Sequence, residues 1–144
     1  MKPISVVLIL FTAIAAAAPP PEYEPIDLQP LHDKISVRMR QTLVFTFDQR
    51  GDRLVSPRPF RTGDKPQAIR VELLEHHGKS ILLITSSFPR TLQYRGAARF
   101  KDRRSFVTTY SYPVYTNVVD AEGFPGTIEE FVLWDIRLTN IPKP

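Results

Sequence analysis

The sequence contains no cysteine, which excludes disulfide bonds, thiolate nucleophiles and metal sites with cysteine ligands. It has only 6 glycines against 14 prolines. The prolines disfavour long uninterrupted helices, because each internal proline removes a backbone hydrogen-bond donor and clashes with the preceding turn. With 144 residues, 42% of them hydrophobic and 24% charged, the chain has the composition of one small globular domain.

The amino-terminal segment predicts export. Lys2 provides a positive start, and residues 4–18 are almost entirely apolar and end in four alanines. This is the pattern of a secretory signal peptide, and the apolar run is short for a membrane-spanning helix, which needs about 20 residues. We therefore expect residues 1–17 to be a signal peptide that is cleaved before Ala18. The absence of cysteine and of glycosylation sequons favours a bacterial protein that is periplasmic or secreted.

The segment that follows the signal peptide is rich in proline and acidic residues. Five prolines fall within residues 19–31, with acidic side chains between them. Such a composition stays extended and solvated and does not pack a core. We expect residues 18–33 to be a Pro-rich extended tether, and a proline-rich ligand for a partner domain is the alternative.

The first strand pattern begins directly after this segment. Residues 35–47 alternate apolar and polar side chains with a period of two, which is typical of a half-buried antiparallel strand. The run is long for one strand, so we expect a bend or bulge near Gln41. A turn at residues 48–52 then leads into a short return strand, which Pro57 and Pro59 confine to the edge of a sheet.

Further strand patterns fill the rest of the chain, at residues 69–73, 80–86, 92–100, 106–114 and 128–139. The continuous apolar run within residues 80–86 predicts a central strand that is covered on both faces. Gly96 predicts a bulge or a close approach of two chain segments. In the last strand we expect Trp134 to share the core face with Ile136 and Leu138. Residues 60–67 and 115–126 are expected to be loops.

These patterns together predict the fold class. No stretch carries a sustained apolar stripe at helical spacing, and about seven strands are separated by turn signals. We expect residues 34–141 to form a single all-β domain, an antiparallel immunoglobulin-like sandwich. A small Greek-key or up-and-down barrel is the alternative.

Residues that could carry catalysis or hold a metal are few. No Gly-Xaa-Ser-Xaa-Gly motif is present, and the sequence has only 3 histidines. His76 and His77 are weak metal candidates, because adjacent side chains on a strand point to opposite faces. We therefore expect no cofactor, no metal and no catalytic residues. The alternative is a metal-binding protein or small hydrolase that uses these two histidines with acidic residues of the loop at 115–126.

Arginines on predicted strands give the one hint of a partner. Arg38 and Arg40 share the polar face of the first strand, and Arg95 and Arg99 share that of a later one. If the two strands are neighbours, these four side chains form a basic face that can bind an anionic polymer or an acidic protein. The alternative is a solvated sheet face with interspersed acidic residues.

The sequence thus predicts a binding protein. The formal charge of +4, or +3 without Lys2, is too mildly basic to indicate nucleic-acid binding. We expect an exported, non-catalytic β-sandwich with no integral membrane span after signal cleavage. It would bind or support another envelope component, either an unknown protein or an anionic polymer.

Overall fold

The computed structural model describes residues 24–144. These residues form strands and loops but no α-helix, and hence no helix that could cross a membrane. The predicted signal peptide and the first part of the Pro-rich segment lie outside the described residues. The strands are β1 (Pro25–Ile26), β2 (Ile35–Arg38), β3 (Thr42–Arg50), β4 (Arg53–Pro59), β5 (Ile69–His76), β6 (Lys79–Ser86), β7 (Thr91–Phe100), β8 (Phe106–Thr109), β9 (Val119–Phe124) and β10 (Ile128–Thr139).

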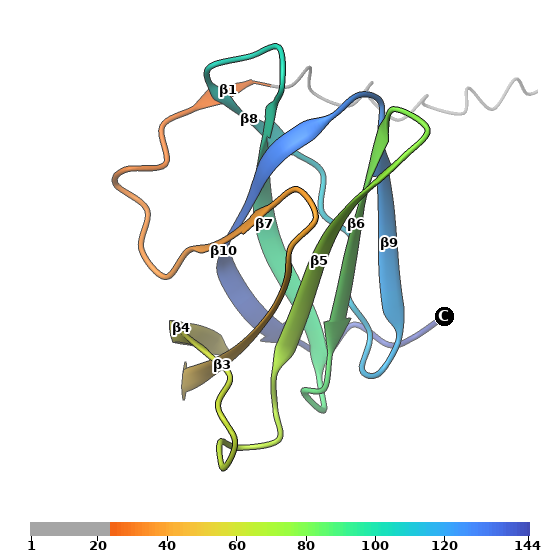
Figure 1. Ribbon diagram of the computed structural model, residues 1–144. Coiled ribbons are helices and arrows are strands. Elements are labelled where there is room, and N and C mark those ends of the chain that lie inside the picture. Colours follow the sequence, from red (N-terminus) through yellow and green to blue (C-terminus); the bar gives the residue numbers. More distant parts are fainter. Residues whose placement is uncertain (1–23) are drawn as a thin grey trace, which may run out of the picture.

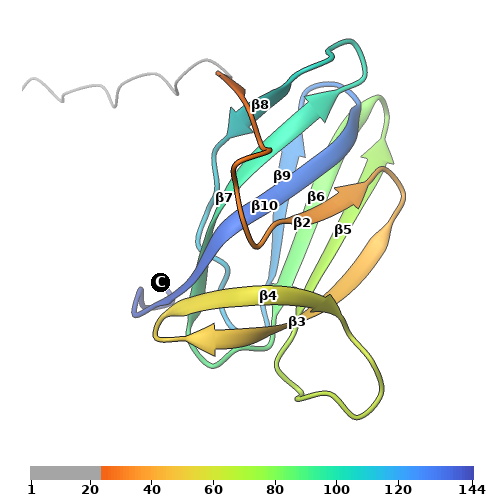
Figure 2. The same ribbon diagram turned by 90° about the vertical axis from the view of Figure 1, so that its left-hand side faces the viewer.

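All pairs between these strands are antiparallel. Hydrogen-bonded neighbours follow the order β1-β8-β7-β10-β4-β3-β5-β6-β9, and β2 pairs with the first half of β10 beside β4. The sheet folds over through the β3–β4 hairpin, so that β7 and β10 form one layer and β5, β6 and β9 the other (Figure 1). Figure 2 shows β7 and β10 in front of β5 and β6, with β3 and β4 running across one end.

The predicted all-β antiparallel sandwich is therefore confirmed, with ten strands in the described residues in place of about seven. Three differences account for the larger number. The run at residues 35–47 is two strands, β9 lies inside the segment expected to be the loop 115–126, and β1 belongs to the expected tether.

The break in the first run has a local cause. Arg40 adopts a left-handed conformation with φ of 66°, and the side chain of Gln41 accepts a hydrogen bond from the backbone N–H of Arg38 at 2.9 Å. The chain turns there from β10, the partner of β2, to β5, the partner of β3. The bend expected near Gln41 is thus a crossing between the two layers.

The main core fills the space between the layers. On β5 the odd-numbered residues from Ile69 to Leu73 point inward, and on β6 the even-numbered residues from Ser80 to Ser86 do so. The outward residues Ile81 and Leu83 are only half-buried. The expectation that β6 is covered on both faces is therefore wrong: β6 is central between two strands, but one of its faces is partly open.

A second, smaller apolar cluster lies on the outer side of the β7–β10 layer. It consists of Ala97, Val132 and Trp134, which are buried beneath half-buried side chains of residues 24–34 and of Phe106. We call residues 24–34 the amino-terminal arm. Its covering side chains are Ile26, Leu28 and Leu31.

The arm differs from the solvated tether expected at these positions. Its strand β1 pairs with β8 at the sheet edge, and the side chain of Asp33 accepts a hydrogen bond from the backbone N–H of Ser56 at 2.8 Å. Glu24, Asp27 and the two prolines of the arm are exposed, whereas three apolar side chains at irregular spacing face the sheet. Burial of those side chains offsets the entropy lost in ordering the arm.

Two register shifts in β10 explain the position of Trp134. One lies between Ile128 and Glu130, and the other lies between Trp134 and Arg137. At the second shift Asp135 has a left-handed φ of 49°. As a result Trp134 points outward while Ile136 points into the main core. The expectation that these two residues share a face is wrong, because a bulge reverses the alternation.

Candidate functional site

The strands β2 and β7 flank β10, and the amino-terminal arm covers the middle of their outer side, over Ala97, Val132 and Trp134. Glu130 of β10 lies opposite Arg38 on one side and Arg99 on the other, and Trp134 lies opposite Arg95. We call the outer side of these three strands, together with the charged side chains at both bulges, the β10 face. Three of the four arginines proposed from the sequence thus lie in one sheet layer, but their strands β2 and β7 are separated by β10 and are not direct neighbours.

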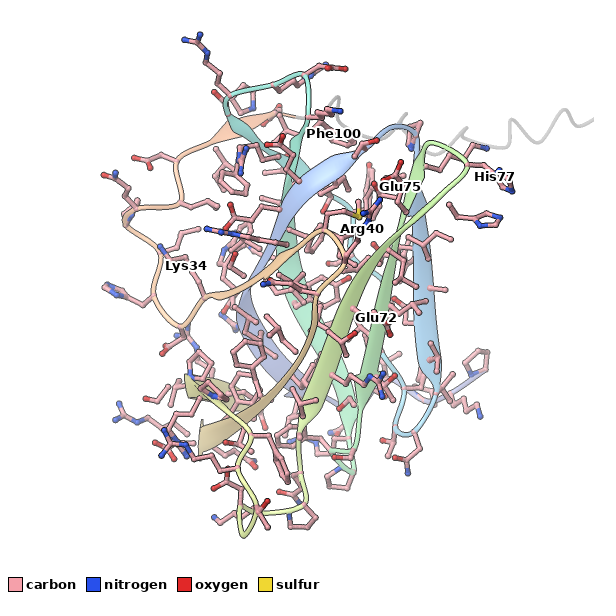
Figure 3. All side chains as sticks on the ribbon, in the orientation of Figure 1. Lys34, Arg40, Glu72, Glu75, His77 and Phe100 are labelled. Atoms are coloured by element: carbon pink, nitrogen blue, oxygen red, sulfur yellow. The ribbon has the colours of Figure 1, made fainter. Side chains whose placement is uncertain are left out.

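Arg40 is the exception. It sits in the turn between β2 and β3, where its backbone N–H donates to the carbonyl of Leu73 at 2.7 Å and its side chain forms an ion pair of 3.9 Å with Glu75. Figure 3 places Arg40 beside Glu75 of β5. The expectation that Arg40 shares a face with Arg38 is wrong, because the left-handed turn residue ends the strand alternation.

The first bulge of β10 builds an ion-pair cluster around Arg99. Glu129 is the extra residue of the bulge, and both Glu129 and Glu130 form ion pairs with the Arg99 guanidinium, the second at 3.2 Å. The Ser36 hydroxyl also donates to Glu130. Burial raises the pKa of Glu130, but the hydrogen bonds from Ser36 and Arg99 and the charges of Arg99 and Arg38 together hold that pKa below its usual value. Arg99 is therefore largely neutralised by its neighbours.

The second bulge collects arginines around one carboxylate. Asp135 forms ion pairs with Arg53 at 3.3 Å, with Arg137 at 2.9 Å and with Arg95 at 3.8 Å. The four side chains come from β4, β7 and β10, which meet here because Arg53 pairs with Arg137. All three guanidiniums are at least half exposed.

This cluster borders a depression of about 340 Å³ between the arm and the β10 face. One wall is the arm, from Pro30 to Asp33, and the other is made by β4, β7 and β10. Trp134 lines the depression beside its cross-strand partner Arg95. The lining therefore combines apolar side chains with guanidinium groups.

The charge balance of the β10 face is positive. Its arginines are Arg38, Arg53, Arg95, Arg99 and Arg137, and its carboxylates are Glu129, Glu130 and Asp135. Within the described residues Arg38 makes no ion pair within 4.0 Å, and Arg95 makes only the long contact to Asp135. These two side chains keep most of their capacity for an external anion.

Sequence reasoning missed Arg53, Arg137 and Asp135. Arg53 is brought to the site by a single β4–β10 pair between residues 84 positions apart, and local patterning carries no signal for such a pair. Asp135 was visible only as a polar residue on the last strand. The bulge that turns it toward three arginines depends on those arginines being there.

The histidines and the acidic residues of the alternative metal or hydrolase site are separated. His76 and His77 are exposed at the tip of the β5–β6 hairpin, and Figure 3 shows His77 projecting from it. Asp120 and Glu122 are on β9, with Glu122 buried. In residues 24–144 no group of three histidine, aspartate or glutamate side chains is close enough to hold one metal ion.

Glu122 instead belongs to a buried hydrogen-bond cluster. Its carboxylate accepts from the Tyr94 hydroxyl and from the backbone N–H of Tyr112, each at 3.2 Å. Burial raises the pKa of Glu122 to about 7; the nearby charge of Asp120 adds to the increase, and the two hydrogen bonds oppose it. Burial and the charges of Glu122 and Asp120 likewise hold the pKa of Tyr94 well above its ordinary value. This cluster joins β9 to β7 and to the loop after β8.

The chain matches no protein-family model, no curated protein and no solved structure. No relative therefore assigns a role to any residue of the β10 face. The function has to be argued from the residues of this chain and their geometry.

Proposed function

We propose that the protein is an exported, non-catalytic β-sandwich that binds an anionic component of the cell envelope through the β10 face. Export rests on the signal-peptide pattern of residues 1–17, which lie outside the described residues. The binding role rests on the convergence of five arginines and three carboxylates on the outer side of β2, β7 and β10 and the adjoining end of β4. That convergence is the observation that carries the proposal.

The arrangement of the charges favours binding over a purely structural role. An arginine that served only to pair with neighbouring carboxylates would be enclosed by them, as Arg99 is by Glu129 and Glu130. Arg38 and Arg95 are exposed and lack a close partner among residues 24–144. Exposed charges contribute little to folding, but they attract a partner of opposite charge over a distance of about 10 Å at moderate salt.

A polyanion-binding assay tests the proposal. The double variant Arg38→Gln/Arg95→Gln should bind immobilised poly-L-glutamate or polyphosphate at least about fivefold more weakly than the wild type, because each lost contact contributes roughly 0.5–1 kcal/mol. Binding by the wild type should also weaken as salt is raised, and the variant should depend less steeply on salt.

The variant Arg58→Gln/Arg61→Gln is the matched control. It removes the same charge from exposed positions at β4 and the following loop, away from the β10 face. Its thermal midpoint and that of the test variant should both stay near the wild-type value. Equal losses of binding in the two variants, or no binding by the wild type, would refute a role for this face.

A further inference from the structure

The cluster around Asp135 has more hydrogen-bond donors than its own carboxylate can use. Asp135 Oδ1 accepts from one nitrogen of Arg53 and one of Arg137. Arg95 approaches Oδ2 at 3.8 Å without forming a hydrogen bond. Each guanidinium carries several N–H donors in a rigid planar fork, and that fork matches the oxygens of a carboxylate or a phosphate. All three arginine side chains line the depression and are at least half exposed, so their guanidiniums are accessible to a ligand.

The second bulge of β10 brings the side chains of this cluster together. The bulge puts two residues of β10, Asp135 and Ile136, opposite the single residue Tyr94 of β7. Asp135 occupies the left-handed region, which aspartate and asparagine adopt more readily than other residues except glycine. The bulge interrupts the strand alternation, so that Asp135 points outward together with Arg137.

The depression has room for a small molecule beside these donors. Its volume of about 340 Å³ is at the lower end of the range for ligand pockets in proteins. Pro30 and Leu31 of the arm and Trp134 of β10 provide apolar surface within it. Asp33 also lines it, but its carboxylate already holds the backbone N–H of Ser56. The remaining arm residue in the lining is His32, which is exposed.

We propose that this depression is a subsite for one sugar-sized unit that carries an oxyanion, a carboxylate or a phosphate. The oxyanion would lie between Arg53, Arg95 and Arg137, and the body of the unit would lie against the arm. The subsite rests on the proposed function, since it names the part of an envelope polymer that the β10 face recognises. Asp135, which pairs with all three arginines, would compete with the ligand anion for them.

Competition between Asp135 and the ligand anion predicts opposite effects of two substitutions on ligand binding. Replacing Arg53 should weaken ligand binding, whereas replacing Asp135 by asparagine should strengthen it, because the internal competitor loses its charge. Asparagine tolerates the left-handed conformation, so the variant Asp135→Asn should keep the bulge. A cluster that is merely structural would give no gain in binding from that substitution.

The experiment titrates the full chain with glucuronate, glucose 6-phosphate and neutral glucose. Trp134 is the only tryptophan in the sequence and lines the depression, so its fluorescence reports occupancy directly. Both anionic sugars should change the emission with saturation, and glucose should not. The anionic sugar that binds more tightly identifies the anion as carboxylate or phosphate.

The expected effects are a dissociation constant about five- to tenfold higher in Arg53→Gln and about fivefold lower in Asp135→Asn. Arg58 and Asp48 provide matched controls, because they form an exposed ion pair of 3.1 Å on β4 and β3, outside the depression. The variants Arg58→Gln and Asp48→Asn should leave sugar binding unchanged. Thermal midpoints of all four variants establish that each is folded.

Three outcomes would overturn the subsite: no saturable change with either anionic sugar, equal binding of glucose, or equal effects of Arg53→Gln and Arg58→Gln. The proposed function fails separately, in the polyanion assay. If Arg53→Gln keeps wild-type affinity for poly-L-glutamate and polyphosphate while Arg38→Gln, at a position outside the depression, loses it, the β10 face binds polyanions without this subsite. If the sugars bind as expected but the polyanions do not, the subsite stands and the polymer proposal falls.

Discussion

Gly96 of β7 lies directly against the ring of Phe131 from the neighbouring strand. A methyl group at Gly96 would come within 2.7 Å of Phe131 Cζ and 2.9 Å of Thr109 Oγ1. Phe131 is fully buried in the main core, so a methyl group at Gly96 would force a packed side chain to shift. Only glycine fits this position, which agrees with the close approach expected there from the sequence.

The variant Gly96→Ala should therefore be destabilised by about 1–3 kcal/mol, the usual cost of overpacking a core. Chemical denaturation of the two proteins measures this difference. Gly123 on β9 is the control, because a Cβ atom there meets nothing within 4 Å. A Gly96→Ala protein as stable as Gly123→Ala would contradict the packing of Phe131 against this strand.

Trp134 holds the amino-terminal arm to the sheet. Its buried indole is covered by Ile26, Leu28 and Leu31, apart from the main core. The variant Trp134→Ala should lose about 3–5 kcal/mol of stability, because a large cavity opens beneath the arm. The arm should also detach before the sandwich unfolds, and limited proteolysis within residues 24–34 would detect that.

The variant Phe131→Ala separates the two effects. It removes a side chain of the main core and should lower global stability by a similar amount without specific exposure of the arm. Cleavage of the arm at the same rate in both variants would argue against its attachment through Trp134.

The strands were largely predictable because most of them are half-buried. Period-two alternation is visible wherever one face meets the core, as along β5 and β7, and the hairpin turns at Gly51 and Gly78 carry positive φ angles that glycine adopts readily. The outward arginines Arg38, Arg95 and Arg99 could be placed on a polar face for the same reason. Their grouping into one layer required the strand order, which local patterns do not encode.

The features that escaped prediction depend on contacts between distant segments. The arm has too few apolar side chains, at too irregular a spacing, to indicate a buried segment among prolines. That Ile26, Leu28 and Leu31 pack against the sheet follows only from the fold, which places them against the cluster that contains Trp134. The bulges of β10 place Glu129 and Asp135 beside arginines of β7 and β4. A carboxylate inside a strand pattern does not indicate a bulge by itself, because the arginines that pair with it lie on other strands.

Export can be tested without any partner. The signal-peptide pattern of residues 1–17 predicts a mature chain that begins near Ala18. Amino-terminal sequencing of protein recovered from the envelope fraction should therefore start at or close to that residue. An uncleaved chain in the cytoplasm would contradict both the signal peptide and the envelope setting of the proposed function.

Glu122 should make the stability of the protein depend on pH in an uncommon direction. Its folded-state pKa of about 7 is above the ordinary value of 4.5, so between these values the folded state binds a proton that the unfolded state has lost. The free energy of unfolding should thus fall as pH rises from about 4.5 to about 7. Asp120, whose pKa burial also raises, acts in the same direction.

The variant Glu122→Gln isolates this contribution from that of other carboxylates. Glutamine keeps an oxygen that can accept from Tyr94 and Tyr112 but has no charge to bury. At about pH 8 the variant should be more stable than the wild type by up to about 3 kcal/mol, and near pH 4 the two should be nearly equal.

Denaturant unfolding across this pH range measures the free energy of unfolding of both proteins. The test is the difference between the two free energies at each pH, because Glu130 has a lowered pKa and contributes to both pH profiles with the opposite sign. A Glu122→Gln profile parallel to that of the wild type would show that the pKa of Glu122 is not raised in the folded protein.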